Sequence, residues 1–366
     1  MANASAPRRI RSGQALSGWL FTAPVLLILG VFLLVPVLMA AWVSVSDWTG
    51  RGSPFASGVN LVGGDNYARL TSGGGLAASD FGTSLKNNLW YVILVVPTQT
   101  ALALGLALLV NRRVLRGRGF FRTAYYFPSV TSSVAITVLW LFLFSTTGAV
   151  NAVIAALGGS GPNWFNDPNG LFHFGAQQGP EFLTANTTLG VSWWDWLGGP
   201  SVAMTAFILL AVFTTSGTFM LLFLAALQNL SAEVEEAAEV DGAGSWQRFW
   251  RVTFPQLRPA LFTVITLGLI GSWQVFDQIA VGSQGEPGKT TLTPAYLSYQ
   301  NSFGQNEWGA GAAIAFILFA IIIVFTVIQR LVLTERTISN AKAQRIRRAY
   351  ADAGRGPASG RRGGAS

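Results

Sequence analysis

The residues of this 366-residue chain that could do chemistry gather in one charged segment, residues 229–259. Carboxylates fill its first half and guanidinium groups its second half. They are Glu233, Glu235, Glu236, Glu239 and Asp241, followed by Arg248, Arg251 and Arg258. Acids near the start of a helix and bases near its end suit the helix dipole, and Gly242 and Gly244 interrupt the helical pattern. The charged segment is therefore predicted to form two helices joined by a glycine turn.

Gly242 is the residue on which this turn depends. A chain that reverses between two helices needs a positive φ angle or a close approach of the backbone, and glycine allows both without strain. Beyond the turn, Trp246, Phe249 and Trp250 are three and four residues apart, so they share one face of the second helix. Pro255 is expected to lie where that helix ends.

Few other residues have the types that catalysis or metal binding needs. The chain has no cysteine, which excludes disulfides and thiolate metal sites, and its single histidine, His173, cannot form a histidine cluster or a Ser–His triad. Residues 282–290 come close to a phosphate-binding loop, but Ser283 stands where that motif requires its first glycine. We therefore predict no catalytic residue, no metal site and no cofactor held by this chain.

The composition places the chain among membrane proteins: 51% of the residues are apolar and only 11% are charged. A span needs about 20 apolar residues, and six stretches meet this requirement. The expected spans are residues 19–45, 88–110, 124–146, 202–228, 260–281 and 311–333. The predicted fold class is all-α, a polytopic membrane protein with six transmembrane helices.

The positive charges predict how these spans are oriented. Of the 24 Lys and Arg residues, 20 lie in or beside segments that the six spans would place on the same side of the membrane. The exceptions are Arg51, Arg69, Lys86 and Lys289. By the positive-inside rule that side is the cytosol, and it holds both termini and the charged segment. Residues 147–201 then form the longest outer loop, rich in Gly, Pro and aromatics, and are expected to make a small cap with short helices. The net charge of +8 is sorted by side of the membrane and forms no nucleic-acid patch.

The charged segment resembles the cytoplasmic coupling loop of ABC-importer membrane subunits. That family shares a Glu-Ala-Ala triplet, a glycine, and an apolar pair before a proline, all at fixed spacing. The matching residues are Glu236, Ala237, Ala238, Gly242, Val252, Phe254 and Pro255. Asp241-Gly242-Ala243 looks like the carbohydrate-importer branch of the family.

Two other stretches are similar to sugar permeases, in particular to the maltose-type first permease. In the third-span region the matching residues are Phe121, Arg122, Pro128, Trp140, Gly148 and Asn151. After the fifth span they are Phe276, Asp277, Gly285, Pro287, Thr291, Tyr299 and Phe303. The resemblance covers about residues 15–335 and departs from the family in the lengthened outer loop and at residues 284–287.

The resemblance implies the type I ABC importer fold, with residues 1–18 as a cytosolic tail, 19–335 as the permease domain and 336–366 as a basic, disordered tail. It implies a multi-pass protein of the bacterial cytoplasmic (inner) membrane, working with a second related permease, a cytosolic ATPase dimer that binds ATP and Mg, and an extracytoplasmic sugar-binding protein. The cargo would be a sugar, in particular an oligosaccharide. The ATPase would contact the residues of the matching motif, namely Glu236, Ala237, Ala238, Asp241, Gly242 and Pro255.

Candidate residues for the sugar path follow from polar groups inside the predicted spans. Trp273, Gln274 and Asp277 fall on one helical face, where amide and carboxylate could bind hydroxyls and a ring could cover a sugar face. Asp277 could instead be solvated at the interface or pair with a neighbouring subunit. Gln99, beside Pro97, either lines the path or stabilises a helix kink. The small polar run Thr214-Thr215-Ser216-Gly217 is interpreted mainly as a site of close helix packing.

Other functions fit the same residues less well. Within the ABC class, the cargo could be a polyol phosphate or another small polar solute. A secondary carrier would show inverted repeats and buried ionisable groups at mid-membrane, and a membrane scaffold would need no polar path. Co-purification of an ATPase distinguishes these classes.

Overall fold

The computed structural model describes residues 12–72, 75–112, 116–173 and 179–333. The expectations for the first eleven residues and for the basic tail lie outside the described residues. Within the described part, helices dominate and a single pair of two-residue strands is present. Five helices are long and apolar enough to cross a membrane, and a bent pair of shorter helices would make a sixth span.

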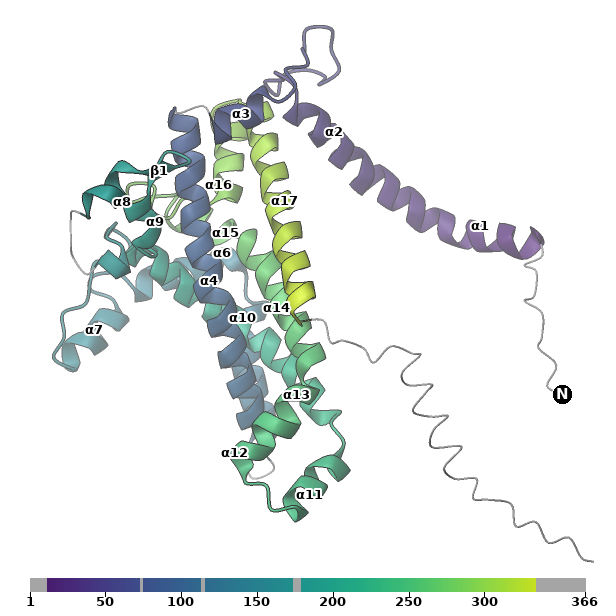
Figure 1. The fold of residues 1–366 in the computed structure, drawn as a ribbon, viewed down its shortest axis with the longest axis vertical. Coiled ribbons are helices and arrows are strands. Elements are labelled where there is room, and N and C mark those ends of the chain that lie inside the picture. Colours follow the sequence, from purple (N-terminus) through teal and green to yellow (C-terminus); the bar gives the residue numbers. More distant parts are fainter. Residues whose placement is uncertain (1–11, 73–74, 113–115, 174–178, 334–366) are drawn as a thin grey trace, which may run out of the picture.

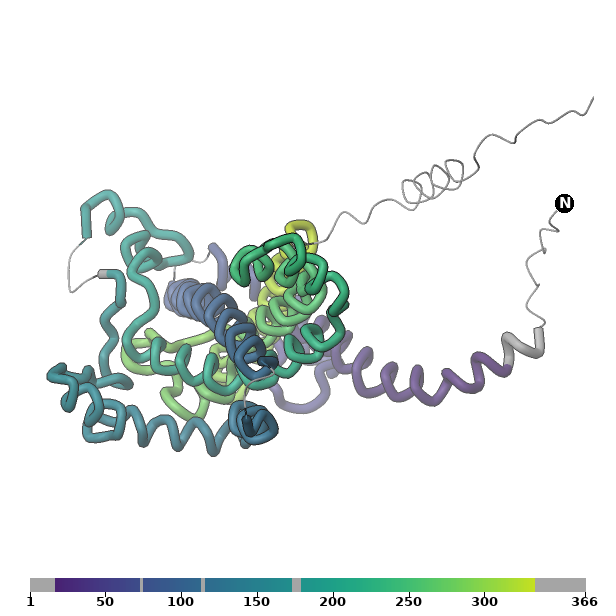
Figure 2. Tube along the Cα trace, turned by 90° about the horizontal axis from the view of Figure 1, so that it is seen from below, coloured from purple at the N-terminus to yellow at the C-terminus, as the bar shows by residue number. Residues whose placement is uncertain are grey.

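The first span is an arm that leaves the rest of the molecule (Figures 1 and 2). It consists of α1 (Ser12–Leu29), the π-helical turn η1 (Gly30–Leu34) and α2 (Val35–Ser44). None of its most apolar 18-residue window is buried within this chain. Only α2 packs on another span, the C-terminal helix α17 (Trp308–Leu333). The apolar surface of the arm is therefore available to lipid or to another subunit.

The core of the molecule is built around α10 (Val202–Gln228), whose bounds are those expected for the fourth span. It packs against α4 (Leu76–Asn111), α5 (Arg118–Val130) and α14 (Arg258–Trp273). Phe207, Met220 and Phe223 of α10 are fully buried. A helix that is apolar over most of its surface favours such a central place, although Leu209, Phe213 and Leu222 of α10 stay exposed.

Two of the expected spans are interrupted helices. The span at 124–146 divides into α5 and α6 (Ser133–Leu143), which meet at an angle of 100°. The span at 260–281 divides into α14 and α15 (Asp277–Gly282), with residues 274–276 outside both helices. The second halves, α6 and α15, pack against each other.

Side chains from neighbouring helices satisfy the backbone groups that the second break leaves free. Asn88 Nδ2 donates to the carbonyl of Trp273 at 3.0 Å, and Thr293 Oγ1 donates to the carbonyl of Val275 at 3.1 Å. Both bonds are buried. Irregular backbone inside a membrane protein is tolerated only when its polar groups are bonded within the protein or face water. The two hydrogen bonds therefore stabilise this break. In the other broken span, Pro128 near the end of α5 removes a helical donor.

The other elements of this part of the described chain are short. They are α3 (Asp65–Thr71), α7 (Ala149–Ala156), η2 (Leu171–His173), α8 (Glu181–Ala185), β1 (Thr187–Thr188), β2 (Val191–Ser192), α9 (Trp193–Leu197), α16 (Pro294–Tyr299) and η4 (Gln300–Gly304). The short helices expected between residues 147 and 201 are present as α7, α8 and α9, and we call this segment the cap; its location outside the membrane stays a prediction. The cap is bound to α4 because Trp90 Nε1 donates to the carbonyl of Trp196 at 2.8 Å. Residues 282–290, which come close to a phosphate-binding motif, are held to α4 by an ion pair: Lys289 Nζ lies 2.6 Å from Asp80 Oδ1.

The charged segment lies at the opposite end from α3 (Figure 1). It contains α11 (Ala232–Val240), α12 (Ser245–Arg248), the π-helical turn η3 (Phe249–Thr253) and α13 (Phe254–Gln256). Pro255 lies near the end of this helical path, as expected, because α13 ends at Gln256. It occupies the first turn of α13, where a missing N–H costs no hydrogen bond, and the chain continues through Leu257 into α14.

Candidate functional site

The turn between α11 and α12 has the geometry predicted from the sequence. Gly242 adopts φ +79°, which confirms the expected positive angle. No atom lies within 4 Å of the position that a Cβ would take there, so the turn requires glycine for its backbone angle and not for space. Gly244, two residues later, has an ordinary φ of −63°.

The side chains of α11 lie on the surface of the molecule. None of its residues is buried. Of the predicted contact residues, Glu236, Ala237, Asp241 and Gly242 are exposed, while Ala238 and Pro255 are half-buried. Val240 is 88% exposed. α11 thus carries acidic and apolar side chains that the described residues leave uncovered.

Contacts on the inner side hold α11 in place. Arg248 Nη1 donates to Glu239 Oε2 at 2.7 Å across the turn. Thr253 Oγ1 donates to Glu235 Oε1 at 3.4 Å. Beyond the turn, the rings of Trp246 and Trp250 lie 5.6 Å apart, which confirms the shared aromatic face. Glu235 and Glu239 thus each have a contact within the charged segment, although the Glu239 side chain is 72% exposed.

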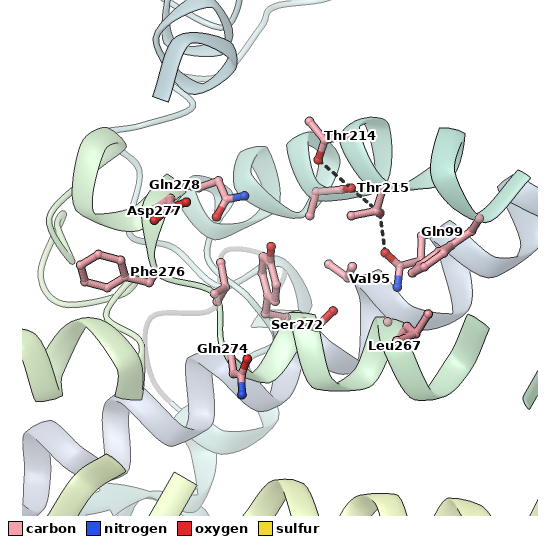
Figure 3. Close-up of a pocket in the computed structure, with 16 residues that line it drawn as sticks. Val95, Gln99, Thr214, Thr215, Leu267, Ser272, Gln274, Phe276, Asp277 and Gln278 are labelled. Carbon is pink, nitrogen blue, oxygen red and sulfur yellow. Dashed lines mark hydrogen bonds between the residues drawn. The ribbon is translucent and has the colours of Figure 1, made fainter. Parts of the chain in front are cut away.

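A cavity of about 280 Å³ lies at the break between α14 and α15 (Figure 3). Helices α4, α10, α14 and α15 contribute its walls. The described residues that line it are Tyr91, Val95, Gln99, Ala211, Thr214, Thr215, Phe219, Leu267, Gly268, Gly271, Ser272, Gln274, Val275, Phe276, Asp277 and Gln278. Both polar groups and apolar carbons line this cavity, which we call the first cavity.

Gln99 is the most buried polar group of the first cavity, with a side chain that is 1% exposed. Its Oε1 accepts a hydrogen bond of 2.5 Å from Thr215 Oγ1, which joins α4 to α10 (Figure 3). Its Nε2 is buried and has no hydrogen-bond partner among the described residues. Gly268 makes room for this amide, because a Cβ at that position would collide with Nε2. Of the two roles that the sequence left open for Gln99, the geometry favours lining the cavity.

The predicted path residues after α14 separate into two groups. Gln274 and Asp277 are exposed at the first cavity. Trp273 is 1% exposed, packs against Phe325 with ring centroids 5.3 Å apart, and is not part of the cavity wall. The expected common helical face of the three residues was wrong, because the helix ends at Trp273 and the chain changes direction before Asp277.

The small polar run in α10 packs closely and also lines the cavity. A Cβ at Gly217 would collide with the carbonyl of Tyr125, and Ser129 Oγ donates to the carbonyl of Thr214 at 2.6 Å. These contacts confirm the expected close packing of α5 on α10. Thr214 and Thr215 additionally face the cavity. Sequence reasoning missed this second role, as it missed Gly268 and Ser272, because both come close to Gln99 only in the folded chain.

Known proteins match most of this chain. A family described as binding-protein-dependent transport system inner membrane components matches residues 99–336. The lactose transport system permease protein LacF of Rhizobium radiobacter is 31% identical over 324 residues, which cover 87% of this chain and 95% of that protein. The arabinooligosaccharides transport system permease protein AraP of Bacillus subtilis strain 168 is 30% identical over 317 residues, covering 85% and 86%.

Among solved structures, a bacterial alginate ABC transporter in complex with an alginate pentasaccharide-bound periplasmic protein contains a similar chain. The TM-score is 0.65 at 18% identity, with 90% of this chain and 96% of that chain covered. This likeness shows the fold of an ABC importer permease. The present chain belongs to the family of binding-protein-dependent transport system inner membrane components. It is a multi-pass, all-α membrane protein of a transport family.

Proposed function

We propose that this chain is the membrane-spanning permease subunit of an ATP-driven, binding-protein-dependent importer of sugars, in particular of oligosaccharides. The observation that carries the proposal is the exposed helix α11, turned outward by Gly242 at one end of the molecule. Its cytosolic partner would be a separate ATPase dimer that binds ATP and Mg. A second, related permease would complete the translocation path, and an extracytoplasmic protein would deliver the sugar.

The backbone supplies a route from the partner surface to the first cavity. From Ser245 the chain is helical through α12, η3 and α13, and Leu257 leads directly into α14. Leu257 is 1% exposed among the core residues of α4 and α10. A displacement of α11 by a closing ATPase would therefore move α14 as a body, and α14 ends at the cavity. Such rigid-body movement around a fixed site is how alternating access works in this scheme.

The cavity suits a neutral sugar. Gln99, Thr214, Thr215, Ser272 and Gln274 offer donors and acceptors for hydroxyl groups, and Phe219 and Phe276 offer ring faces. Asp277 is the one charged side chain among the described residues that line the cavity. A phosphate would be repelled by this carboxylate at close range, which disfavours a polyol phosphate as the cargo.

Transport by the complete importer tests the function. The complex purified through this chain should contain an ATP-hydrolysing subunit. In vesicles with the binding protein it should take up radiolabelled lactose, maltose, trehalose or arabino-oligosaccharides only when ATP is supplied inside. Uptake driven by an ion gradient in the absence of any ATPase would instead identify a secondary carrier. A complex with neither ATP-driven nor gradient-driven uptake would instead indicate a membrane scaffold.

Single cysteines test the proposed orientation, since the natural chain contains none. We expect Gly58→Cys, near the outer end, to react with a membrane-impermeant thiol reagent in intact cells. Gly244→Cys, beside α11, should react only with a permeant reagent. Neither position has an atom within 4 Å of the added Cβ. Labelling of the Gly244→Cys variant from outside would place α11 away from the cytosol and would exclude the coupling role.

A further inference from the structure

Four arginines lie where α4 ends and α5 begins, at the end of the molecule that carries α12 (Figure 1). They are Arg112, Arg116, Arg118 and Arg122, and we call them the arginine cluster. Within the described residues, none of the four forms an ion pair, whereas Arg69 and Arg248 each pair with a glutamate. The described part of the chain therefore leaves four neighbouring positive charges without a counter-charge.

Arg122 shows most clearly that an anion is missing. It lies one turn inside α5 and is half-buried. Its Nε is buried and has no hydrogen-bond partner among the described residues. The adjacent Phe121 packs into the same core cluster as Leu257, which fixes this turn of α5. A guanidinium stays charged at any ordinary pH, and a buried charge is costly unless it is paired. Arg118 precedes it by four residues and shares its helical face.

An exposed apolar ridge begins beside the arginine cluster. Phe120, which lies between Arg118 and Arg122 in the chain, is 73% exposed. Phe127 is 64% exposed and Val130 is 59% exposed. Spacings of seven and three residues place all three on one side of α5. Ten residues of helix are about 15 Å long, which is half of the hydrocarbon thickness of about 30 Å. The apolar ridge is thus as long as one leaflet is thick.

We propose that the arginine cluster binds the phosphate of an anionic phospholipid, whose acyl chains cover the apolar ridge of α5. Arginine binds phosphate through two parallel N–H bonds, and Nε of Arg122 is a donor available for one of them. Basic clusters next to a membrane span attract anionic headgroups. A soluble anion would neutralise the charge but leave the exposed phenylalanines uncovered. The lipid would hold the start of α5 in place, whatever solute the protein transports.

The melting temperature of the complete importer in detergent tests the headgroup. Phosphatidylglycerol should raise it at least about 3 °C more than phosphatidylcholine does. Arg122→Gln should remove most of this difference. The matched control is Arg51→Gln, which removes an exposed charge in the loop between α2 and α3 and should keep the full difference. If Arg122→Gln does not assemble, Arg118→Gln takes its place.

Two results would overturn the lipid site. One is an equal shift of the wild type with both lipids, and the other is a full preference for phosphatidylglycerol in the glutamine variant. Inorganic phosphate at the same concentration should cause no shift. A shift as large as that with phosphatidylglycerol would identify a site for soluble anions and would also contradict the proposal.

A nitroxide attached to Phe127→Cys tests whether lipid covers the apolar ridge. In vesicles containing phosphatidylglycerol, the nitroxide should collide more often with oxygen, which dissolves in hydrocarbon, than with a water-soluble nickel chelate. Gly244→Cys is the control, because it is exposed near α11 and should show the opposite preference. A nitroxide at Phe127→Cys that neither reagent reaches would show that another subunit covers the ridge, and one that nickel reaches more often would show water. Either result would exclude the acyl chains.

Discussion

The charged segment and the first cavity are built in opposite ways. In the charged segment, the decisive residues lie within 25 positions of one another and point outward from a short helix-turn-helix. In the cavity, they come from four helices, and Gln99 and Asp277 lie far apart in the chain. The segment is thus locally encoded and needs a partner to act on, whereas the cavity exists only once α4, α10, α14 and α15 have packed.

This difference teaches where a substitution should affect stability and where it should affect coupling. Side chains of α11 contribute little to the fold, since none is buried. Side chains next to the helix breaks hold the irregular backbone of the membrane domain together. Four predictions test the contrast, beginning with the largest expected effect.

Trp273→Ala should destabilise the membrane domain without a direct effect on sugar binding. The indole is fully buried against Phe325, and replacing such a side chain by alanine costs about 3–5 kcal/mol in soluble proteins. The melting temperature of the purified complex in detergent measures the effect. Glu236→Ala, on the exposed face of α11, should leave that temperature unchanged. Equal melting temperatures for wild type and Trp273→Ala would remove the distinction between the two regions.

Gly242→Val should uncouple the ATPase while leaving insertion into the membrane intact. Valine at φ +79° is strained by about 1–3 kcal/mol, so α11 would leave its position and uptake should fall at least about fivefold. The matched control is Gly244→Val, where φ is −63° and space is open. The measurements are co-purified ATPase and sugar uptake at equal membrane levels. If both variants behave alike, the backbone angle of Gly242 is not what positions α11.

Gly268→Ala should weaken sugar uptake with the ATPase still bound. The added methyl group would displace the Gln99 amide and its bond to Thr215. Loss of one hydrogen bond corresponds to about 0.5–1.5 kcal/mol, so we expect the KM for uptake to rise between about twofold and tenfold. Gly271→Ala is the control, because it lies on the same helix and cavity with nothing within 4 Å. A change in co-purified ATPase without a change in KM would assign Gly268 to helix packing alone.

Reversal of the ion pair between Glu239 and Arg248 should give the smallest effect. The pair spans the glycine turn at 2.7 Å but is solvent-exposed on the Glu239 side, and exposed pairs contribute about 0.2–1 kcal/mol. Glu239→Arg alone should lower uptake by a few-fold, and Glu239→Arg with Arg248→Glu should restore it. Raising the salt concentration should reduce the difference between wild type and the single variant. Failure of the double variant to recover would show that Glu239 contacts the partner directly.

Much of the architecture could be predicted from local patterns. α10 begins and ends at the residues expected from its apolar run. The positive φ of Gly242 could be predicted because it depends only on the local backbone of a tight turn. The aromatic face of Trp246 and Trp250 followed from helical spacing alone. All of these depend on residues within a few positions of each other.

What the sequence by itself determined is therefore the class of the protein, the number of apolar runs and the motif at α11. The tertiary structure alone decided that α14 ends at Trp273, because Asn88 and Thr293 from distant helices satisfy the carbonyls of the break. It alone decided that Trp273 turns into the core while Gln274 and Asp277 face the cavity. Hydrophobic periodicity describes which side of a helix is buried, but a break is stable only if partners far away in the chain bond its free backbone groups. Those partners come into place only when the helices pack.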